Sequence, residues 1–355
     1  MKKQDFDNLN RLVKKGYLRK VEDGDLVSYC YTDKCVYDGH WDEYTLNARG
    51  TVYNKQTNEI VAKSFNKFFN WEELDATKWN QLSKLQYQIF DKLDGSLGIV
   101  FNDGGRWRVN TKGSFASDQS IEATKMLKDY DLDNINTNLT LLVEIVYPEN
   151  KIIVDYGSDR KLILLTVFES DTEKELPWSM VKKAAEYTNM DLVKEFKNST
   201  IEEIIRLQSD LPPTREGFVV RFENGERVKI KGKEYLKIAR ILSGCSPLAF
   251  WESMKSGKVS KDLIISIPEE LRPHFESTIE ELENKYKTIL IEIEEDWKKV
   301  LSKTSVDEPD FRKKLGLYIQ GNHELKHPIA TFSRFLGKDL EKYVMKKIRP
   351  KANQL

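Results

Sequence analysis

The hydrophobic pattern of the 355-residue chain changes once, near residue 240. Before that point, apolar residues fall in short runs separated by turn signals such as 102–105, which is typical of strands joined by tight turns. Beyond Leu236 the strand pattern almost vanishes, and in 275–303 apolar residues recur every three or four positions, the period of an amphipathic helix. The sequence therefore predicts an α+β domain with mainly antiparallel sheets over residues 1–243, followed by an all-helical C-terminal domain over 244–355.

The same periodicity predicts the individual elements. Residues 1–20 carry apolar side chains at helical spacing and predict one helix. The runs that predict strands are 26–31, 50–53, 59–62, 87–90, 97–101, 107–111, 139–147, 161–168, 217–222 and 227–231. The segments that predict further helices are 117–129, 178–188, 200–208, 275–303, 307–319 and 329–348.

Composition excludes several classes of protein. The 57 Lys and Arg residues balance 57 Asp and Glu residues, so a nucleic-acid partner would need a locally basic surface. Cys30, Cys35 and Cys245 form no Cys-x-x-Cys pair, which argues against a zinc module or a disulfide framework. The chain opens without an apolar signal segment, and no apolar run is long enough to span a membrane. We therefore expect a cytoplasmic protein with no membrane partner.

Lys92 carries the sharpest local signal. It ends an apolar strand and is followed at once by Asp94 and Gly95. A lysine partly removed from water favours its neutral amine, which is the nucleophilic form, and a glycine lets the backbone approach a ligand. An exposed lysine beside an ordinary turn would have the same sequence, so this motif is weak without other residues.

Four other charged residues accompany Lys92. Lys229 and Lys231 alternate along one strand and would project from the same face, either as a solvated edge or as a phosphate-binding wall. Glu144 lies inside an apolar strand and Glu216 precedes another. A buried carboxylate costs several kcal/mol unless it is paired or bound to a cation, whereas on a solvated face it would have no such role.

Taken in order, these motifs resemble the covalent nucleotidyltransferase superfamily of polynucleotide ligases and mRNA capping enzymes. Within it, the sequence is most similar to the RNA ligase 1 family of T-even phages over about residues 40–240. The segments that carry this closer resemblance are 47–52, 66–70, 111–114 and 144–154. The helical C-terminal third is only loosely similar.

The resemblance implies an ATP-dependent RNA ligase. Lys92 would attack the α-phosphorus of ATP and carry AMP, which would pass to an RNA 5′-phosphate before a 3′-hydroxyl attacks that end. The implied partner is RNA with these two ends, with nicked tRNA among the candidates, and the chain is expected to act as a monomer. The helical domain would select the RNA, and the basic segment 338–351 would contact its backbone.

The resemblance also implies roles for the phosphate-binding and metal-binding residues. Lys229 and Lys231 would hold the α-phosphate and keep Lys92 uncharged. Glu144 and Glu216 would orient Mg²⁺ or Mn²⁺, directly or through water, or one of them would touch the ribose.

Further roles follow from the same resemblance. Arg49 and Lys67 would reach the ribose and outer phosphates, and Lys112 would be a further nucleotide contact. Asp94 would support the Gly95 turn and act in adenylyl transfer. Adenine would lie beside Phe90. Tyr235 is a candidate for a secondary contact. Phe168 is a candidate for lining the adenine slot, with packing in the core as the alternative.

Two alternatives remain open at this stage. A DNA ligase or a capping enzyme would usually carry a β-rich domain after the last motif, whereas residues 244–355 predict helices. An inactive RNA-binding relative would have no physical reason to keep a costly cluster of charges.

The phage family also leads us to expect two adjacent acids after the domain boundary. Asp262 and Glu269-Glu270 are the nearest candidates and do not match well, so the number of metal ions stays open.

Overall fold

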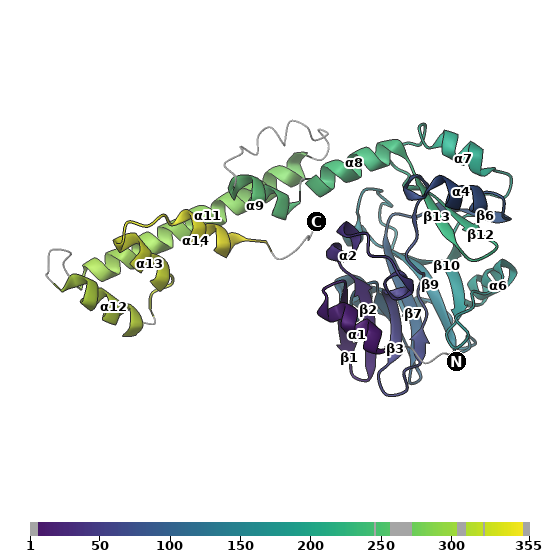
Figure 1. Ribbon diagram of the computed structural model, residues 1–355, viewed down its shortest axis with the longest axis horizontal. Helices are drawn as coiled ribbons and strands as arrows, with labels where there is room; N and C mark the ends of the chain where they lie inside the picture. Colours follow the sequence, from purple (N-terminus) through teal and green to yellow (C-terminus); the bar gives the residue numbers. More distant parts are fainter. Residues whose placement is uncertain (1–5, 245, 256–271, 304–309, 322–323, 351–355) are drawn as a thin grey trace. The chain divides into compact units, whose positions relative to one another are not determined.

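The computed structural model describes residues 6–244, 246–255, 272–303, 310–321 and 324–350 (Figure 1). The chain divides into two compact units, Met1–Ile238 and Ala239–Leu355. The division falls inside a helix that the sequence pattern did not predict, α8 (Lys233–Gly244). Cys245, Asp262, Glu269 and Glu270 lie outside the described residues.

The first sheet of the N-terminal unit is antiparallel, in the order β1-β2-β3-β4. Its strands are β1 (Leu18–Asp23), β2 (Leu26–Tyr31), β3 (Arg49–Asn54) and β4 (Ile60–Ala62). Helix α1 (Phe6–Lys14) lies beside β1, where Leu9 and Leu12 are buried (Figure 1). The helix predicted over 1–20 is therefore wrong beyond Lys14: Gly16 takes a positive φ that ends the helix, and β1 pairs with β2.

The second and third sheets contain the other nine strands of the described residues. The second has the order β11-β10-β9-β7-β8 and the third β5-β13-β12-β6, and the pairs are antiparallel except β10–β11 and β13–β5. The strands of the second sheet are β7 (Ser96–Asp103), β8 (Arg106–Thr111), β9 (Leu139–Val146), β10 (Lys161–Glu169) and β11 (Asp191–Leu192). Those of the third are β5 (Phe69–Asn70), β6 (Tyr87–Lys92), β12 (Gly217–Phe222) and β13 (Arg227–Lys231). The expected α+β class with mainly antiparallel sheets is confirmed.

The link from β6 to β7 positions the site. Strand β6 ends at Lys92 in the third sheet, and β7 begins at Ser96 in the second. Only three residues therefore carry the chain from one sheet to the other, and they include Asp94 and Gly95. Phe90 of β6 packs in the same buried cluster as residues of β9 and β10, so the two sheets share apolar core at this link.

Helices cover the sheets and occupy several connections. The predicted α5 (Asp118–Met126), α6 (Trp178–Thr188) and α7 (Ile201–Leu207) are present. Three short helices were not predicted, namely α2 (Asp33–Tyr37), α3 (Glu43–Asn47) and α4 (Ala76–Leu82). The 3₁₀ turns are η1 (Trp71–Glu73), η2 (Leu127–Asp129) and η3 (Pro148–Asn150).

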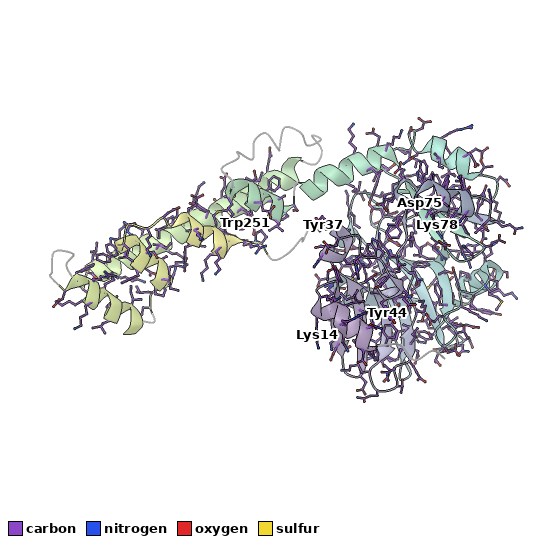
Figure 2. The ribbon with its side chains drawn as sticks, in the orientation of Figure 1. Lys14, Tyr37, Tyr44, Asp75, Lys78 and Trp251 are labelled. Carbon is purple, nitrogen blue, oxygen red and sulfur yellow. The ribbon has the colours of Figure 1, made fainter. Side chains whose placement is uncertain are left out.

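Side-chain caps explain the short helices. Asp75 immediately precedes α4, and its side chain accepts a hydrogen bond from the Lys78 N–H at 2.8 Å; both residues are labelled in Figure 2. Thr32 and Asp42 cap α2 and α3 in the same way. A cap contributes about 1 kcal/mol, which matters in a helix too short to show a hydrophobic period.

The C-terminal unit contains only helices within its described residues, as expected. Besides the end of α8, they are α9 (Pro247–Lys255), α11 (Arg272–Leu301), α12 (Phe311–Gly321), α13 (Pro328–Phe335) and α14 (Glu341–Ile348). The segment predicted over 329–348 is two helices, because the chain turns around Gly337. None of the described helices combines the length and apolar character that a membrane span requires.

Gly50 offers a test of how closely β3 packs against β7 and the end of β8. It has φ +92°, and an added Cβ would lie 2.9 Å from the Cα of Lys112. Gly104 also has a positive φ, of +60°, but a Cβ there would meet no atom within 4 Å. We expect Gly104→Ala to lower the free energy of unfolding by about 1 kcal/mol and Gly50→Ala by about 1–3 kcal/mol more, because β3 and β8 would separate. Urea unfolding of both variants measures this difference, and equal losses would contradict it.

Candidate active site

The site is organised around the start of β12. Gly217 pairs with Lys92 of β6 on one side and with Lys231 of β13 on the other. Glu216 precedes it and is only 4% exposed. Its Oε2 lies 2.6 Å from the Nζ of Lys92, and its Oε1 lies 2.8 Å from the Nζ of Lys231. Lys92 and Lys231, from the ends of two different strands, thus form one ion-paired group with the buried Glu216 carboxylate.

Gly217 allows the strands to approach this closely. Its φ is +143°, and a Cβ at this position would lie 2.1 Å from the carbonyl oxygen of Ile230. A side chain would therefore force β12 and β13 apart. Glycine at this position holds Glu216 between the two lysines.

The same face of the third sheet forms the floor of a cavity of about 210 Å³. Because alternate residues of a strand share a face, the pairing arranges these side chains in successive rows. The rows, from the end of β6 inward, are Lys92–Gly217–Lys231, Phe90–Val219–Lys229 and Gln88–Arg221–Arg227. The cavity is thus cationic at the Lys92 end and is lined by the Phe90 ring farther along. The predicted site residues that line it are Arg49, Phe90, Lys92, Gly95, Glu144, Lys229 and Lys231.

Two of the cations that line the cavity, Arg49 and Lys229, have no ion-pair partner among the described residues. Among the described residues, no carboxylate oxygen lies within 4.0 Å of the side-chain nitrogens of Arg49 or Lys229. Burial, reinforced by nearby Lys67 and Arg49, lowers the pKa of Lys229 to about 7. The Nη1 atom of Arg49 is buried without a hydrogen-bond partner. Buried donors of this kind are costly unless an anion completes the site.

Glu144 faces this charge from the second sheet. Its Oε1 accepts a hydrogen bond of 2.9 Å from the Gly95 N–H. Burial raises the pKa of Glu144 to about 7, although Lys92 opposes this shift, and Glu216 adds to it. A nearby cation would favour the ionised carboxylate.

Asp94 anchors the turn after Lys92. Its Oδ2 accepts hydrogen bonds of 2.8 Å from the N–H groups of Ile153 and Val154, and its Oδ1 accepts one of 2.7 Å from the Tyr235 hydroxyl. Its own N–H donates to the Tyr156 hydroxyl. Neither Asp94 nor Tyr235 lines the 210 Å³ cavity, so in this structure they position the turn.

Glu216 and three other predicted residues also lie outside the lining of this cavity. Lys67 and Phe168 line a neighbouring cavity of about 840 Å³, and Phe168 is 7% exposed in an apolar cluster. The core-packing alternative for Phe168 therefore holds. Lys112 lies over the Tyr31 ring, with its Nζ 4.2 Å from the ring centroid.

Sequence reasoning missed the opposite end of the cavity. The Glu175 carboxylate pairs there with Arg227 and, at 3.3 Å, with the Nε of Arg221, and it accepts a hydrogen bond from Thr166. The Trp178 ring lies 4.6 Å from the Phe90 ring. The alternation of Arg227 with Lys229 and Lys231 was a usable signal for one member of this group, but nothing in the sequence near Glu175 indicated its partners.

The carboxylates that could help to hold a metal are Glu144 and Glu216. The described residues contain no cluster of three or more His, Cys, Asp or Glu side chains suited to a metal ion. Both oxygens of Glu216 contact lysines, whereas Oε2 of Glu144 accepts no hydrogen bond from the described residues. These two residues therefore fit a hard cation only if most of its ligands are phosphate oxygens and water.

The raised pKa of Glu144 predicts a pH dependence of stability. The folded state favours the protonated carboxyl, so this stabilisation is complete below pH 4.5 and is lost as the pH rises toward 7. Lys229, with a pKa lowered to about 7, destabilises the folded state by a nearly constant amount below that pH and makes stability depend on pH mainly above it. Between pH 5 and 7, wild type is expected to lose on the order of 1 kcal/mol more than Glu144→Gln. Urea unfolding at both pH values provides the test, and parallel losses would contradict it.

Comparison with known proteins identifies relatives over this unit. A family model described as RNA ligase matches residues 47–235. A protein of Thermovibrio ammonificans named "Putative RNA ligase" is 27% identical over 62% of this chain and 59% of its own length. A "Putative bifunctional polynucleotide kinase/RNA ligase" of Autographa californica nuclear polyhedrosis virus is 26% identical over 54% of this chain and 30% of its own. The chain thus spans less than two thirds of either relative.

A solved structure shares the fold. A structure described as a "Putative ATP-dependent DNA ligase from Aquifex aeolicus" aligns with 94% of this chain and 88% of its own, with a TM-score of 0.50 and 18% identity. At that identity the likeness concerns the fold alone. The family model, in contrast, matches more than half of the residues, including Lys92, Glu144, Glu216, Lys229 and Lys231. The chain therefore belongs to the RNA ligase family.

Proposed function

We propose that this protein is an ATP-dependent RNA ligase that joins a 5′-phosphate end to a 3′-hydroxyl end through AMP carried on Lys92. The observation that carries the proposal is the position of Lys92. It lies at the cationic end of a cavity and within 2.6 Å of a buried carboxylate, Glu216. Family membership and the resemblance of the motif order support the same reaction.

The first step needs an uncharged amine. Glu216 Oε2 is within hydrogen-bond distance of the Lys92 Nζ and can receive its proton. The Nζ then attacks the α-phosphorus of ATP and a P–N bond forms, while the P–O bond to pyrophosphate breaks with the electron pair leaving on pyrophosphate. The bonded nitrogen gives up its second proton to water, which leaves a phosphoramidate. Lys229 and Lys231 neutralise the non-bridging oxygens of that phosphate.

The next two steps transfer AMP and then release it. An oxygen of the RNA 5′-phosphate attacks the phosphorus of AMP, the P–N bond breaks, and Lys92 takes up a proton. The 3′-hydroxyl then attacks the activated 5′-phosphate, loses its proton, and expels AMP as the phosphodiester forms. In-line positioning of the two phosphates is the main requirement of both steps.

A divalent cation, Mg²⁺ or Mn²⁺, would supply charge neutralisation at the phosphates. Glu144 and Glu216 would help to hold it, together with phosphate oxygens and water. The half-buried carboxyl of Glu144, whose pKa is raised to about 7, would become fully ionised beside such a cation. Adenine would lie against Phe90 and Trp178, which line the same cavity.

The C-terminal unit has the role of choosing the RNA in this proposal. Val344, Met345 and Ile348 of α14 are buried, so Lys342, Lys346 and Lys347 project to solvent. Such a face can contact RNA phosphates, and a nicked tRNA is one candidate substrate. The proposal also takes the enzyme to be a monomer that acts in the cytoplasm.

Covalent AMP is the first testable consequence. Incubation with ATP and Mg²⁺ is expected to add the mass of one AMP to wild type and none to Lys92→Ala, as measured by intact-protein mass spectrometry after removal of bound nucleotide. Lys125→Ala, in which an exposed lysine of α5 is removed, should gain the same mass as wild type. Omission of Mg²⁺ should prevent the gain. No gain in wild type would contradict the proposal.

The nucleic acid can be tested separately. With ATP, wild type is expected to join single-stranded RNA carrying a 5′-phosphate and a 3′-hydroxyl, seen as a longer or circular product on a denaturing gel. DNA of the same sequence should yield far less product, and Lys92→Ala none. More product from nicked duplex DNA than from RNA would favour the DNA ligase alternative, whose fold is also similar.

A further inference from the structure

Two lysines beside the cavity lie against aromatic rings. The Nζ of Lys112 lies 4.2 Å from the Tyr31 ring centroid, and the Nζ of Lys67 lies 4.5 Å from that of Phe69 and 5.5 Å from that of Trp41. Among the described residues, no carboxylate oxygen comes within 4.0 Å of either ammonium group. A cation–π contact attracts a lysine without neutralising it, so both charges remain available to an anion.

The three rings form a continuous surface, here named the ring platform (Tyr31, Trp41 and Phe69). The Trp41 ring lies 5.2 Å from Tyr31 and 5.4 Å from Phe69, in edge-to-face contacts at 82° and 79°. The rings come from the end of β2, the α2–α3 connection and β5. All three are partly exposed, so each presents some of its surface to solvent. Tyr37, labelled at the end of α2 in Figure 2, precedes Trp41 by four positions and is 89% exposed.

The ring platform is separate from the nucleotide cavity and adjoins it. The aromatic residues that line the 210 Å³ cavity are Phe65, Phe68, Phe90 and Trp178. None of the three platform rings lines that cavity. Asn70, which follows Phe69, pairs with Lys229 in the third sheet, and the field of Lys231 reaches Lys67. The ring platform therefore adjoins the side of the cavity that carries Lys229 and Lys231.

We propose that the ring platform binds unpaired bases of the RNA end that is being joined, with Lys67 and Lys112 contacting its phosphates. This proposal rests on the proposed ligase function. Every base has a π-face that stacks on aromatic rings, and alternation of rings with cations is the chemistry that holds single strands. The base of ATP has aromatic residues of its own inside the cavity, which leaves the platform for a second ligand. Paired bases stack on each other, so duplex RNA would bind more weakly.

The decisive variant is Trp41→Leu, which keeps apolar volume and removes the stacking face. A labelled single-stranded RNA with a 5′-phosphate is titrated with protein without ATP, and fluorescence anisotropy gives Kd. We expect Kd to rise about tenfold in Trp41→Leu and to be largely restored in Trp41→Phe. Tyr187→Leu is the matched control, because Tyr187 lies on α6 and is 66% exposed. Blunt duplex RNA should bind wild type more weakly than the single strand.

Adenylylation of the same preparations separates this proposal from the proposed function. Wild type that takes up no AMP contradicts the ligase reaction, whereas the RNA titration still tests the platform. Trp41→Leu is expected to take up AMP. An unchanged Kd in Trp41→Leu overturns the proposal. Tighter binding of duplex RNA than of the single strand would also overturn it. A loss of AMP uptake in folded Trp41→Leu would overturn it too, because that result would assign Trp41 to the nucleotide site.

Discussion

The ion-paired contact of Glu216 with Lys92 and Lys231 is the interaction on which the site depends. It exists because Gly217 lets β12 lie so close to β13 that no side chain would fit between them. The contact brings together residues separated by more than a hundred positions in the chain. It also leaves the Lys92 amine beside a group able to take its proton, so one packing constraint sets both the geometry and the proposed chemistry.

Around this group, the cavity carries more positive than negative charge. Arg49 and Lys229 have no carboxylate partner within ion-pair distance in the described part of the chain, and Lys67 and Lys112 lie against aromatic rings. Burial lowers the pKa of Lys229 and raises that of Glu144, each toward 7. Such an arrangement is costly in the free protein, and the proposed phosphates and divalent cation would offset that cost. The formal net charge of the whole chain is zero, so the positive charge of the cavity comes from where its lysines and arginines are placed.

Several elements were predicted closely and others were not. The strands at 26–31, 217–222 and 227–231 and the helix at 178–188 have the predicted bounds, because their periodicity or turn residues are clear. Helices α2, α3 and α4 were missed, because capping side chains stabilise them in place of a hydrophobic face. Most of the predicted site residues line the cavity. Glu175 was missed because its partners Arg221 and Arg227 lie about fifty residues away.

By itself, the sequence determined the alternation of strands, the helical C-terminal third and the order of Lys92, Glu144, Glu216, Lys229 and Lys231. These properties are local, since periodicity, turn residues and motif spacing act over a few positions. Tertiary structure decided that Glu216 bridges two lysines, that Asp94 anchors the turn, and that Lys67 and Lys112 face rings outside the cavity. It decided these because side-chain pairing depends on strand register and burial, which arise only when distant segments pack together.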